Sequence, residues 1–477
     1  MKRLLLFLLF EMAQCACAQP FVTKIYSYTE SSDIVYGQQT DFAGNERILL
    51  LDVFLPANDT PPPCGRPLLV FVHGGAWMVG TKDDGTATAV CREFAQRGYV
   101  AASVNYRLGA FHTHDPVHCD LYGWDCYNQA DSSECIRAIY RGMQDVKGAI
   151  RFLVKNAAAY QIDPRNVFVA GESAGGFIAL YTGFLDLPSE KPPDCSALPD
   201  VLPPSSFAET NCIQAFGLDT SVASMDLSRP DLGSIDGPLH LDAPPYTIRG
   251  IGNIYGGILQ NILAQQAGPA PAIYLYQQPN DLLVPYYHDR LANGFNYCAE
   301  NWAGCSYVPH LPYAWGSSGI AWLVHNGLTV APAPALRFDS TFNDADCVTQ
   351  MLFPATAGHR IDSPELRSLN MATFFAAQLE ESADCNLSAG SAPQQDSVWL
   401  YPNPATGGNV RIQGLQGTEA SVQIIEISGR VLYRSDLPVR NNSVLLYVPA
   451  GIAAGLYWVK VRDGRGEWLL RLIIGRK

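Results

Sequence analysis

The feature that most constrains the fold is the pentapeptide Gly171-Glu172-Ser173-Ala174-Gly175, which directly follows an apolar run at 167–170. Glycines on both sides of a serine permit a strand-to-helix turn so sharp that larger residues would collide with either element. Such a turn lifts the serine hydroxyl out of the backbone and holds it at the N-terminal end of the helix, where negative charge is stabilised. The pattern therefore predicts a nucleophilic Ser173 at the edge of a sheet.

A second motif lies upstream. The apolar run 67–72 predicts a buried strand and leads into His73-Gly74-Gly75-Ala76-Trp77. Glycines let a backbone approach a ligand closely, and backbone N–H groups stabilise the oxyanion that forms when a carbonyl is attacked. A glycine-rich turn without a ligand is the alternative for this motif alone. Beside Ser173, we expect an oxyanion hole with N–H donors from Gly74, Gly75, Ala76 and Ala174. We also expect the adjacent Trp77 to contact substrate.

Two residues downstream complete the predicted site. Asp281 follows the short apolar run 272–276, so its carboxylate is expected at the C-terminal edge of a parallel sheet. His359 precedes a helix-like stretch that begins at Pro364. The chain order Ser173, Asp281, His359 is the order expected for a catalytic triad on an α/β-hydrolase sheet. The other candidates for the acid are Asp289, Asp339, Asp344 and Asp346.

Five motifs in order make the region from about residue 40 to 380 resemble the carboxylesterase and lipase branch of the α/β-hydrolases. They occupy 73–77, 104–109, 145–156, 163–167 and 171–176. The resemblance implies that Ser173 is the nucleophile, His359 the general base and Asp281 its orienting partner. It also implies an acyl-enzyme intermediate and no metal or organic cofactor.

Alternating strands and helices predict the α/β class, with a mostly parallel sheet and helices on both faces. The further predicted strands are 48–55, 99–104 and 213–218, and the predicted helices are 90–97 and 134–156. Three insertions interrupt the alternation, at 111–131, 185–211 and 298–346. Such loops commonly build the pocket at the edge of a sheet.

The start of the chain has the pattern of a signal peptide. A basic Met1-Lys2-Arg3 precedes the apolar run 4–10, and Ala16-Cys17-Ala18 has small residues at the positions of a cleavage site. We expect a signal peptide over 1–18, because the apolar run is too short to span a bilayer. Lipid attachment at Cys15 or Cys17 is the alternative.

Cysteine usage also favours export. Thirteen cysteines are more than an enzyme of a reducing compartment usually carries. Their spacing suggests disulfide pairs, and no paired CxxC motifs support a zinc site instead. Eleven cysteines remain after removal of the predicted signal peptide. The suggested pairs among them are Cys119–Cys126, Cys298–Cys305, Cys195–Cys212, Cys64–Cys91 and Cys347–Cys385, which leave Cys135 unpaired.

Composition and charge narrow the classes of partner. The chain has 477 residues and 48% hydrophobic residues, enough for two or three domains with a large core. Its net charge of −13 argues against nucleic acid or an anionic membrane surface as a partner, because either requires a basic face.

The pattern changes after the predicted hydrolase domain at 19–387. A polar linker is predicted at 388–397, and short alternating strands over 398–477 predict a small antiparallel sandwich. Motifs at 400–404, 427–430 and 455–461 resemble the C-terminal sorting domain of type IX secretion substrates. This resemblance implies that secretion machinery exports the protein across the outer membrane. A carbohydrate-binding sandwich is the alternative, with Trp399, Trp458 and Trp468 stacking on sugars.

Together these patterns predict a secreted serine hydrolase that cleaves carboxylic esters, either small molecules or polymers. Acylated plant polysaccharide, lipid and polyester are all compatible substrates. A serine peptidase on the same fold is one alternative, because it shares the triad. A noncatalytic binding protein on a hydrolase scaffold is the other, although such proteins usually lack a triad residue.

Overall fold

The structure is a computed structural model of the chain, and the described residues are 20–111 except Asp59, 129–202, 226–295, 311–342, Thr349, 358–380 and, with short gaps, 398–474. The predicted signal peptide and the predicted strand at 213–218 lie outside the described residues. Within those residues, no helix is both long and apolar enough to cross a lipid bilayer.

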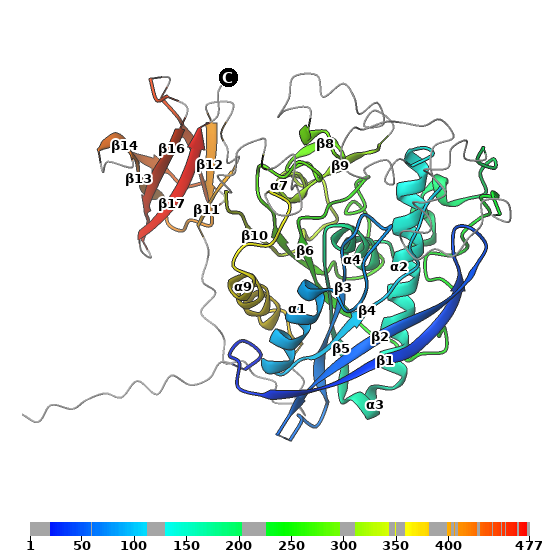
Figure 1. The fold of residues 1–477 in the computed structure, drawn as a ribbon. Helices are drawn as coiled ribbons and strands as arrows, with labels where there is room; N and C mark the ends of the chain where they lie inside the picture. Colours follow the sequence, from blue (N-terminus) through cyan, green and yellow to red (C-terminus); the bar gives the residue numbers. More distant parts are fainter. Residues whose placement is uncertain are drawn as a thin grey trace, which may run out of the picture.

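The predicted mostly parallel sheet is confirmed. Its strands are β1 (Ser27–Thr40), β2 (Glu46–Ala57), β3 (Arg66–Val72), β4 (Val100–Val104), β5 (Ile162–Glu172), β6 (Ile248–Ile254), β7 (Ala272–Tyr276) and β10 (Leu336–Asp339). Over the described residues they form one eight-stranded sheet in the order β1-β2-β4-β3-β5-β6-β7-β10 (Figure 1). Strand β2 runs antiparallel to β1 and β4, and the other neighbours are parallel.

Helices cover both faces of this sheet (Figure 1). Helices α1 (Gly85–Gln96) and α9 (Pro364–Ala376) pack on one face, where Phe94 and Phe375 share a core cluster with Leu69 and Phe71 of β3. Helices α2 (Ser132–Lys155) and α4 (Ala174–Phe184) pack on the other face, over Leu68, Val70 and Val72. Alternate residues of β3 thus point into two cores, and every residue of the strand is buried.

Smaller elements connect this framework. They are α3 (Ala157–Tyr160), the 3₁₀ turns η2 (Pro188–Glu190) and η3 (Pro193–Cys195), and α7 (Ser317–His325). Strands β8 (His288–Arg290) and β9 (Tyr313–Trp315) form a two-stranded ribbon.

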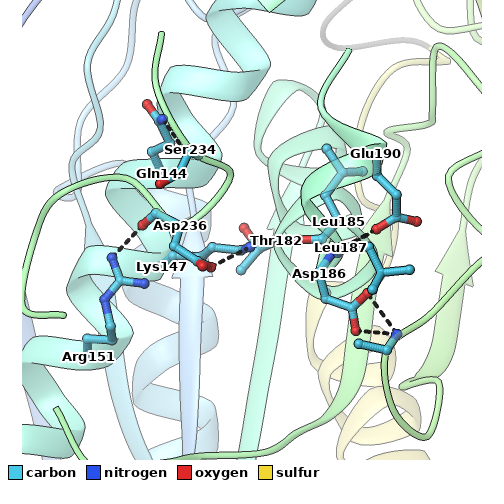
Figure 2. A network of polar contacts seen from close by, with 12 residues as sticks. Gln144, Lys147, Arg151, Thr182, Leu185, Asp186, Leu187, Glu190, Ser234 and Asp236 are labelled. Atoms are coloured by element: carbon cyan, nitrogen blue, oxygen red, sulfur yellow. Dashed lines mark hydrogen bonds and ion pairs between the residues drawn. The ribbon is translucent and has the colours of Figure 1, made fainter. Parts of the chain in front are cut away.

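Helix α2 is buried over most of its length although it carries many polar residues. Its first turn is capped by the Asp131 side chain, which accepts the N–H of Ser133 at 3.0 Å. Figure 2 shows how its buried polar side chains are satisfied: Gln144 donates to the carbonyl oxygen of Ser234, and Lys147 donates to that of Leu185, both at 2.7 Å. Helix α2 therefore holds the neighbouring chain at Leu185 and at Ser234 by donating hydrogen bonds to their backbone carbonyls.

Lys147 allows a test of this network. Burial lowers the pKa of its ammonium group, which also pairs with Asp236. We expect Lys147→Met to lower the free energy of unfolding by about 1–3 kcal/mol, because a buried carbonyl loses its donor. Chemical denaturation measures the change. Lys155→Met is the matched control on the same helix, and it should leave the stability unchanged because Lys155 forms an exposed ion pair. Equal stability of both variants would contradict the assignment.

Two of the predicted disulfides are wrong. Cys91 and Cys195 are free and buried, so neither Cys64–Cys91 nor Cys195–Cys212 forms. Cys91 is among the buried residues of α1 and belongs to the core cluster beneath that helix, a position that cysteine spacing does not reveal. Cys135 is free, as predicted. Cys64 is disulfide-bonded, and its partner lies outside the described residues because the other described cysteines are free.

The C-terminal strands form separate antiparallel sheets, which confirms the predicted all-β character. They are β11 (Trp399–Tyr401), β12 (Asn409–Gln413), β13 (Glu419–Glu426), β14 (Val431–Pro438), β15 (Ser443–Tyr447), β16 (Gly455–Arg462) and β17 (Glu467–Ile474). Among the described residues they pair as β11-β12-β15 and β14-β13-β16-β17. Alternate residues such as Val410, Val422 and Val459 are fully buried in one core cluster.

Candidate active site

Ser173 occupies a sharp turn between β5 and α4, as the glycine pattern predicts. Its φ of 52° and ψ of −122° are a strained conformation for a residue with a side chain, costing about 1–3 kcal/mol. A Cβ atom on Gly171 would lie 2.3 Å from the carbonyl oxygen of Gly175, and one on Gly175 would lie 2.1 Å from that of Val72. Only glycine fits at either position.

The structure brings Ser173, His359 and Asp281 into one hydrogen-bonded chain. His359 Nδ1 lies 2.8 Å from Asp281 Oδ2, and His359 Nε2 lies 2.8 Å from Ser173 Oγ. Because the carboxylate only accepts, Nδ1 donates to it and Nε2 is left to accept the serine hydroxyl. His359 and Asp281 are buried, and Ser173 is partly exposed. This arrangement can remove the serine proton as the oxygen attacks an electrophile.

The Asp281 carboxylate is held in place from several directions. Its Oδ1 accepts the N–H groups of Leu283 at 2.9 Å and Val284 at 3.0 Å, and Gln277 Nε2 donates to its Oδ2 at 3.3 Å. The carboxylate is therefore fixed before any ligand arrives.

The other candidates for the acid have different partners or lie elsewhere. Asp289 accepts from Asn293, and Asp339 accepts from Tyr274 and Asn370. Asp344 and Asp346 lie outside the described residues. Among the described candidates, only Asp281 bonds to His359.

The oxyanion loop, which we define as residues 73–80, has an unusual backbone. Gly75, Ala76 and Trp77 have φ values of 107°, 50° and 63°. A Cβ atom on Gly75 would lie 2.1 Å from the carbonyl oxygen of Val79, and one on Gly74 would lie 3.2 Å from Ser173 Cβ. The loop therefore passes directly beside the serine.

The predicted oxyanion donors are available for a ligand. These donors are the backbone N–H groups of Gly74, Gly75, Ala76 and Ala174. None of them donates a hydrogen bond within the described residues. His73, at the start of the loop, is fully buried and stacks on Tyr106 with ring centroids 4.5 Å apart. Burial lowers the pKa of His73, which favours its neutral form.

Trp77, a residue of the oxyanion loop, packs against α4. Only 5% of its surface is exposed, and its indole N–H donates to the carbonyl oxygen of Ala174 at 3.2 Å. Its ring meets Phe177 edge to face, with centroids 5.4 Å apart. The indole N–H is thus already engaged by the protein, and contact with substrate stays a prediction.

Sequence reasoning did not single out two residues beside His359. The Tyr255 ring lies edge-on to the imidazole, with centroids 4.7 Å apart, and its hydroxyl donates to the Glu172 carboxylate. Burial raises the pKa of Glu172, and hydrogen bonds from Tyr255 and Thr86 offset part of this increase. Two signals were present in the sequence, an acid inside the serine pentapeptide and a tyrosine directly after β6.

Among the described residues, no group of three or more His, Cys, Asp or Glu side chains is arranged to hold a metal ion.

Comparison with known families agrees with the fold. A family model of the α/β hydrolase fold matches residues 69–203, and one of the carboxylesterase family matches residues 13–114. The chain carries an α/β-hydrolase domain related to the carboxylesterases. A model of the secretion system C-terminal sorting domain matches residues 399–475, so the all-β region corresponds to such a domain.

Similar proteins include several esterases. Human carboxylesterase 3 is 34% identical over 159 residues, which are 32% of this chain and 24% of that protein. Para-nitrobenzyl esterase of Bacillus subtilis (strain 168) is 32% identical over 164 residues, 34% of this chain and 27% of that protein. The matches thus span only about a quarter of these relatives. Among solved structures, a truncated carbohydrate esterase from gut microbiota is 16% identical with a TM-score of 0.38, covering 74% of this chain and 97% of that one.

Proposed function

We propose that this protein is a secreted serine esterase that cleaves carboxylic esters through an acyl-enzyme intermediate. The observation that carries the proposal is the chain of two 2.8 Å hydrogen bonds from Asp281 through His359 to Ser173. It ends beside the oxyanion loop, where the N–H groups of Gly74, Gly75 and Ala76 donate no hydrogen bond within the described residues. A nucleophile, a base and donors for an oxyanion are the parts that acyl transfer needs.

In the proposed first step, His359 takes the Ser173 proton as Oγ attacks the ester carbonyl carbon. The carbonyl oxygen becomes an anion, and we assign its stabilisation to the N–H groups of Gly75, Ala76 and Ala174, with Gly74 as a further candidate. Collapse of the tetrahedral intermediate breaks the bond to the alkoxy oxygen, and His359 returns the proton to the leaving alcohol. Water then attacks the acyl-enzyme by the same route.

Export is the second part of the proposal. The sorting domain supports passage through a type IX secretion system, with the signal peptide over 1–18 directing the first membrane crossing. The disulfide at Cys64 supports an oxidising destination. We assign the hydrolase domain to 19–387, the linker to 388–397 and the sorting domain to 398–477. Secretion machinery is then the partner, and the mature enzyme is released or surface-attached.

Parallel assays separate this function from the serine peptidase and from the noncatalytic binding protein. The purified chain should hydrolyse p-nitrophenyl acetate and butyrate, and it should leave the matched aminoacyl p-nitroanilides nearly untouched. Faster turnover of the anilides would favour the peptidase. Absence of hydrolysis of both sets by a folded protein would favour the noncatalytic scaffold. A panel of acylated polysaccharide, triglyceride and polyester then ranks the substrate classes.

A further inference from the structure

The oxyanion loop cannot hold its shape by local preference alone. Gly75, Ala76 and Trp77 are consecutive left-handed residues, and two of them carry side chains that disfavour this conformation. Backbone strain of this kind persists only where the surroundings hold it in place. The contacts of residues 73–80 with the rest of the protein therefore determine where the loop N–H groups point.

Trp77 supplies three of those contacts. Its indole N–H donates to the carbonyl oxygen of Ala174 at 3.2 Å, and its own carbonyl oxygen accepts the N–H of Gly109 at 2.8 Å. Its ring packs edge to face on Phe177, one helical turn beyond the serine. Over the part of the chain that the structure describes, the indole bond is the one hydrogen bond between the oxyanion loop and α4.

The position of this bond matters because Ala174 both accepts the Trp77 indole N–H and carries a proposed oxyanion donor. Its carbonyl oxygen receives the Trp77 indole, and its N–H group is a proposed oxyanion donor. The other proposed donors, on Gly75 and Ala76, immediately precede Trp77 in the loop. The indole bond thus ties the two sets of donors together at a single residue. Small changes in such a separation have large effects, because donors must lie near hydrogen-bond distance of the developing oxyanion.

We propose that Trp77 is a positioning residue. Its indole hydrogen bond to Ala174, which we call the clasp, holds the oxyanion loop against helix α4 and keeps the N–H groups of both directed at one point. The inference rests on the proposed esterase function and deepens it. An aromatic ring without the N–H can still pack against Phe177, but the hydrogen bond to Ala174 requires the indole N–H. Removal of that N–H therefore separates positioning from packing.

Two variants remove the donor in different ways. Trp77→Phe keeps an aromatic ring, and replacement of Trp77 by 3-benzothienylalanine keeps the bicyclic shape with sulfur in place of N–H. We expect kcat for p-nitrophenyl acetate to fall about 10- to 100-fold in both, because the oxyanion donors are misplaced in the transition state. KM should stay within about twofold. Affinity for a trifluoromethyl ketone, which forms an anionic adduct with the serine, should fall by the same factor as kcat/KM.

Trp322→Phe is the matched control. Trp322 lies on α7, and its ring contacts among the described residues are with Tyr287 and Trp315, on neither the oxyanion loop nor α4. It should leave kcat, KM and inhibitor affinity unchanged. Thermal unfolding of all variants separates a loss of folding from a loss of positioning, and the benzothienyl variant covers the case in which the smaller phenyl ring unfolds the protein.

Hydrogen–deuterium exchange of a peptide covering residues 73–80 tests, independently of activity, whether the Trp77 hydrogen bond holds the loop in place. Exchange should be faster in both Trp77 variants than in the wild type and unchanged in Trp322→Phe. Wild-type exchange together with wild-type kcat would overturn the proposal, as would a rise in KM alone, which indicates substrate contact. If the wild type hydrolyses no ester, the proposed function fails, and unaltered exchange in the variants then overturns the clasp as well.

Discussion

Ser173→Ala is expected to lower kcat for p-nitrophenyl acetate by about 10⁴- to 10⁶-fold, because the methyl group cannot form the acyl-enzyme. The proposed oxyanion donors and His359 remain in that variant, so a small residual rate above that of water is expected. The backbone turn at this position is set by Gly171 and Gly175, which stay in place. Initial-rate kinetics over a range of substrate concentrations measure the effect.

The control for this variant is Ser31→Ala, which changes an exposed serine of β1 and should keep wild-type kinetics. Circular dichroism and thermal unfolding establish that Ser173→Ala is folded. Relief of the strained serine conformation does not follow from this change, because alanine also carries a Cβ atom. Full hydrolytic activity in a folded Ser173→Ala protein would remove Ser173 from the mechanism.

Asp281→Asn is expected to lower kcat by about 10³- to 10⁴-fold at neutral pH with little change in structure. The carboxylate accepts from His359 Nδ1 at 2.8 Å, which leaves Nε2 free to take the serine proton. An amide at this position donates its NH₂ group to Nδ1, so the imidazole carries its proton on Nε2 and cannot act as a base. Activity should recover partly as the pH rises, because hydroxide takes over the role of the base.

Asp289→Asn is the matched control, since Asp289 follows Asp281 along the chain, on β8, and bonds to Asn293 instead of His359. It should keep wild-type activity. The reverse result, with an active Asp281→Asn and an inactive Asp289→Asn, would transfer the acid role to Asp289.

The parts of the site that sequence predicted are those set by short-range sterics and chain order. Gly171 and Gly175 flank Ser173 because any side chain there would overlap the backbone, and this requirement is visible in five residues. Asp281 and His359 were found because each follows a strand or precedes a helix in the order of an α/β sheet. Their side chains meet Ser173 because the C-terminal ends of parallel strands share one edge.

The parts that sequence did not predict depend on contacts between distant segments. Tyr255 reaches Glu172 across 83 positions because β5 and β6 are neighbours in the sheet, and β6 is too rich in glycine to be recognised as a strand. Strand β10 has four residues and β1 is largely exposed and polar, so neither shows a strong hydrophobic pattern. Cysteine spacing failed for the same reason, because Cys91 is a buried residue of α1 that faces the core and is a free thiol.

The measurement that tests the central claim most directly is covalent labelling with a fluorophosphonate, followed by peptide mapping by mass spectrometry. The account predicts a stoichiometric adduct on Ser173 Oγ, complete loss of ester hydrolysis on labelling, and no adduct in Ser173→Ala or Asp281→Asn over the same time. An adduct on a different residue, or full labelling of Ser173 with undiminished ester hydrolysis, would contradict it.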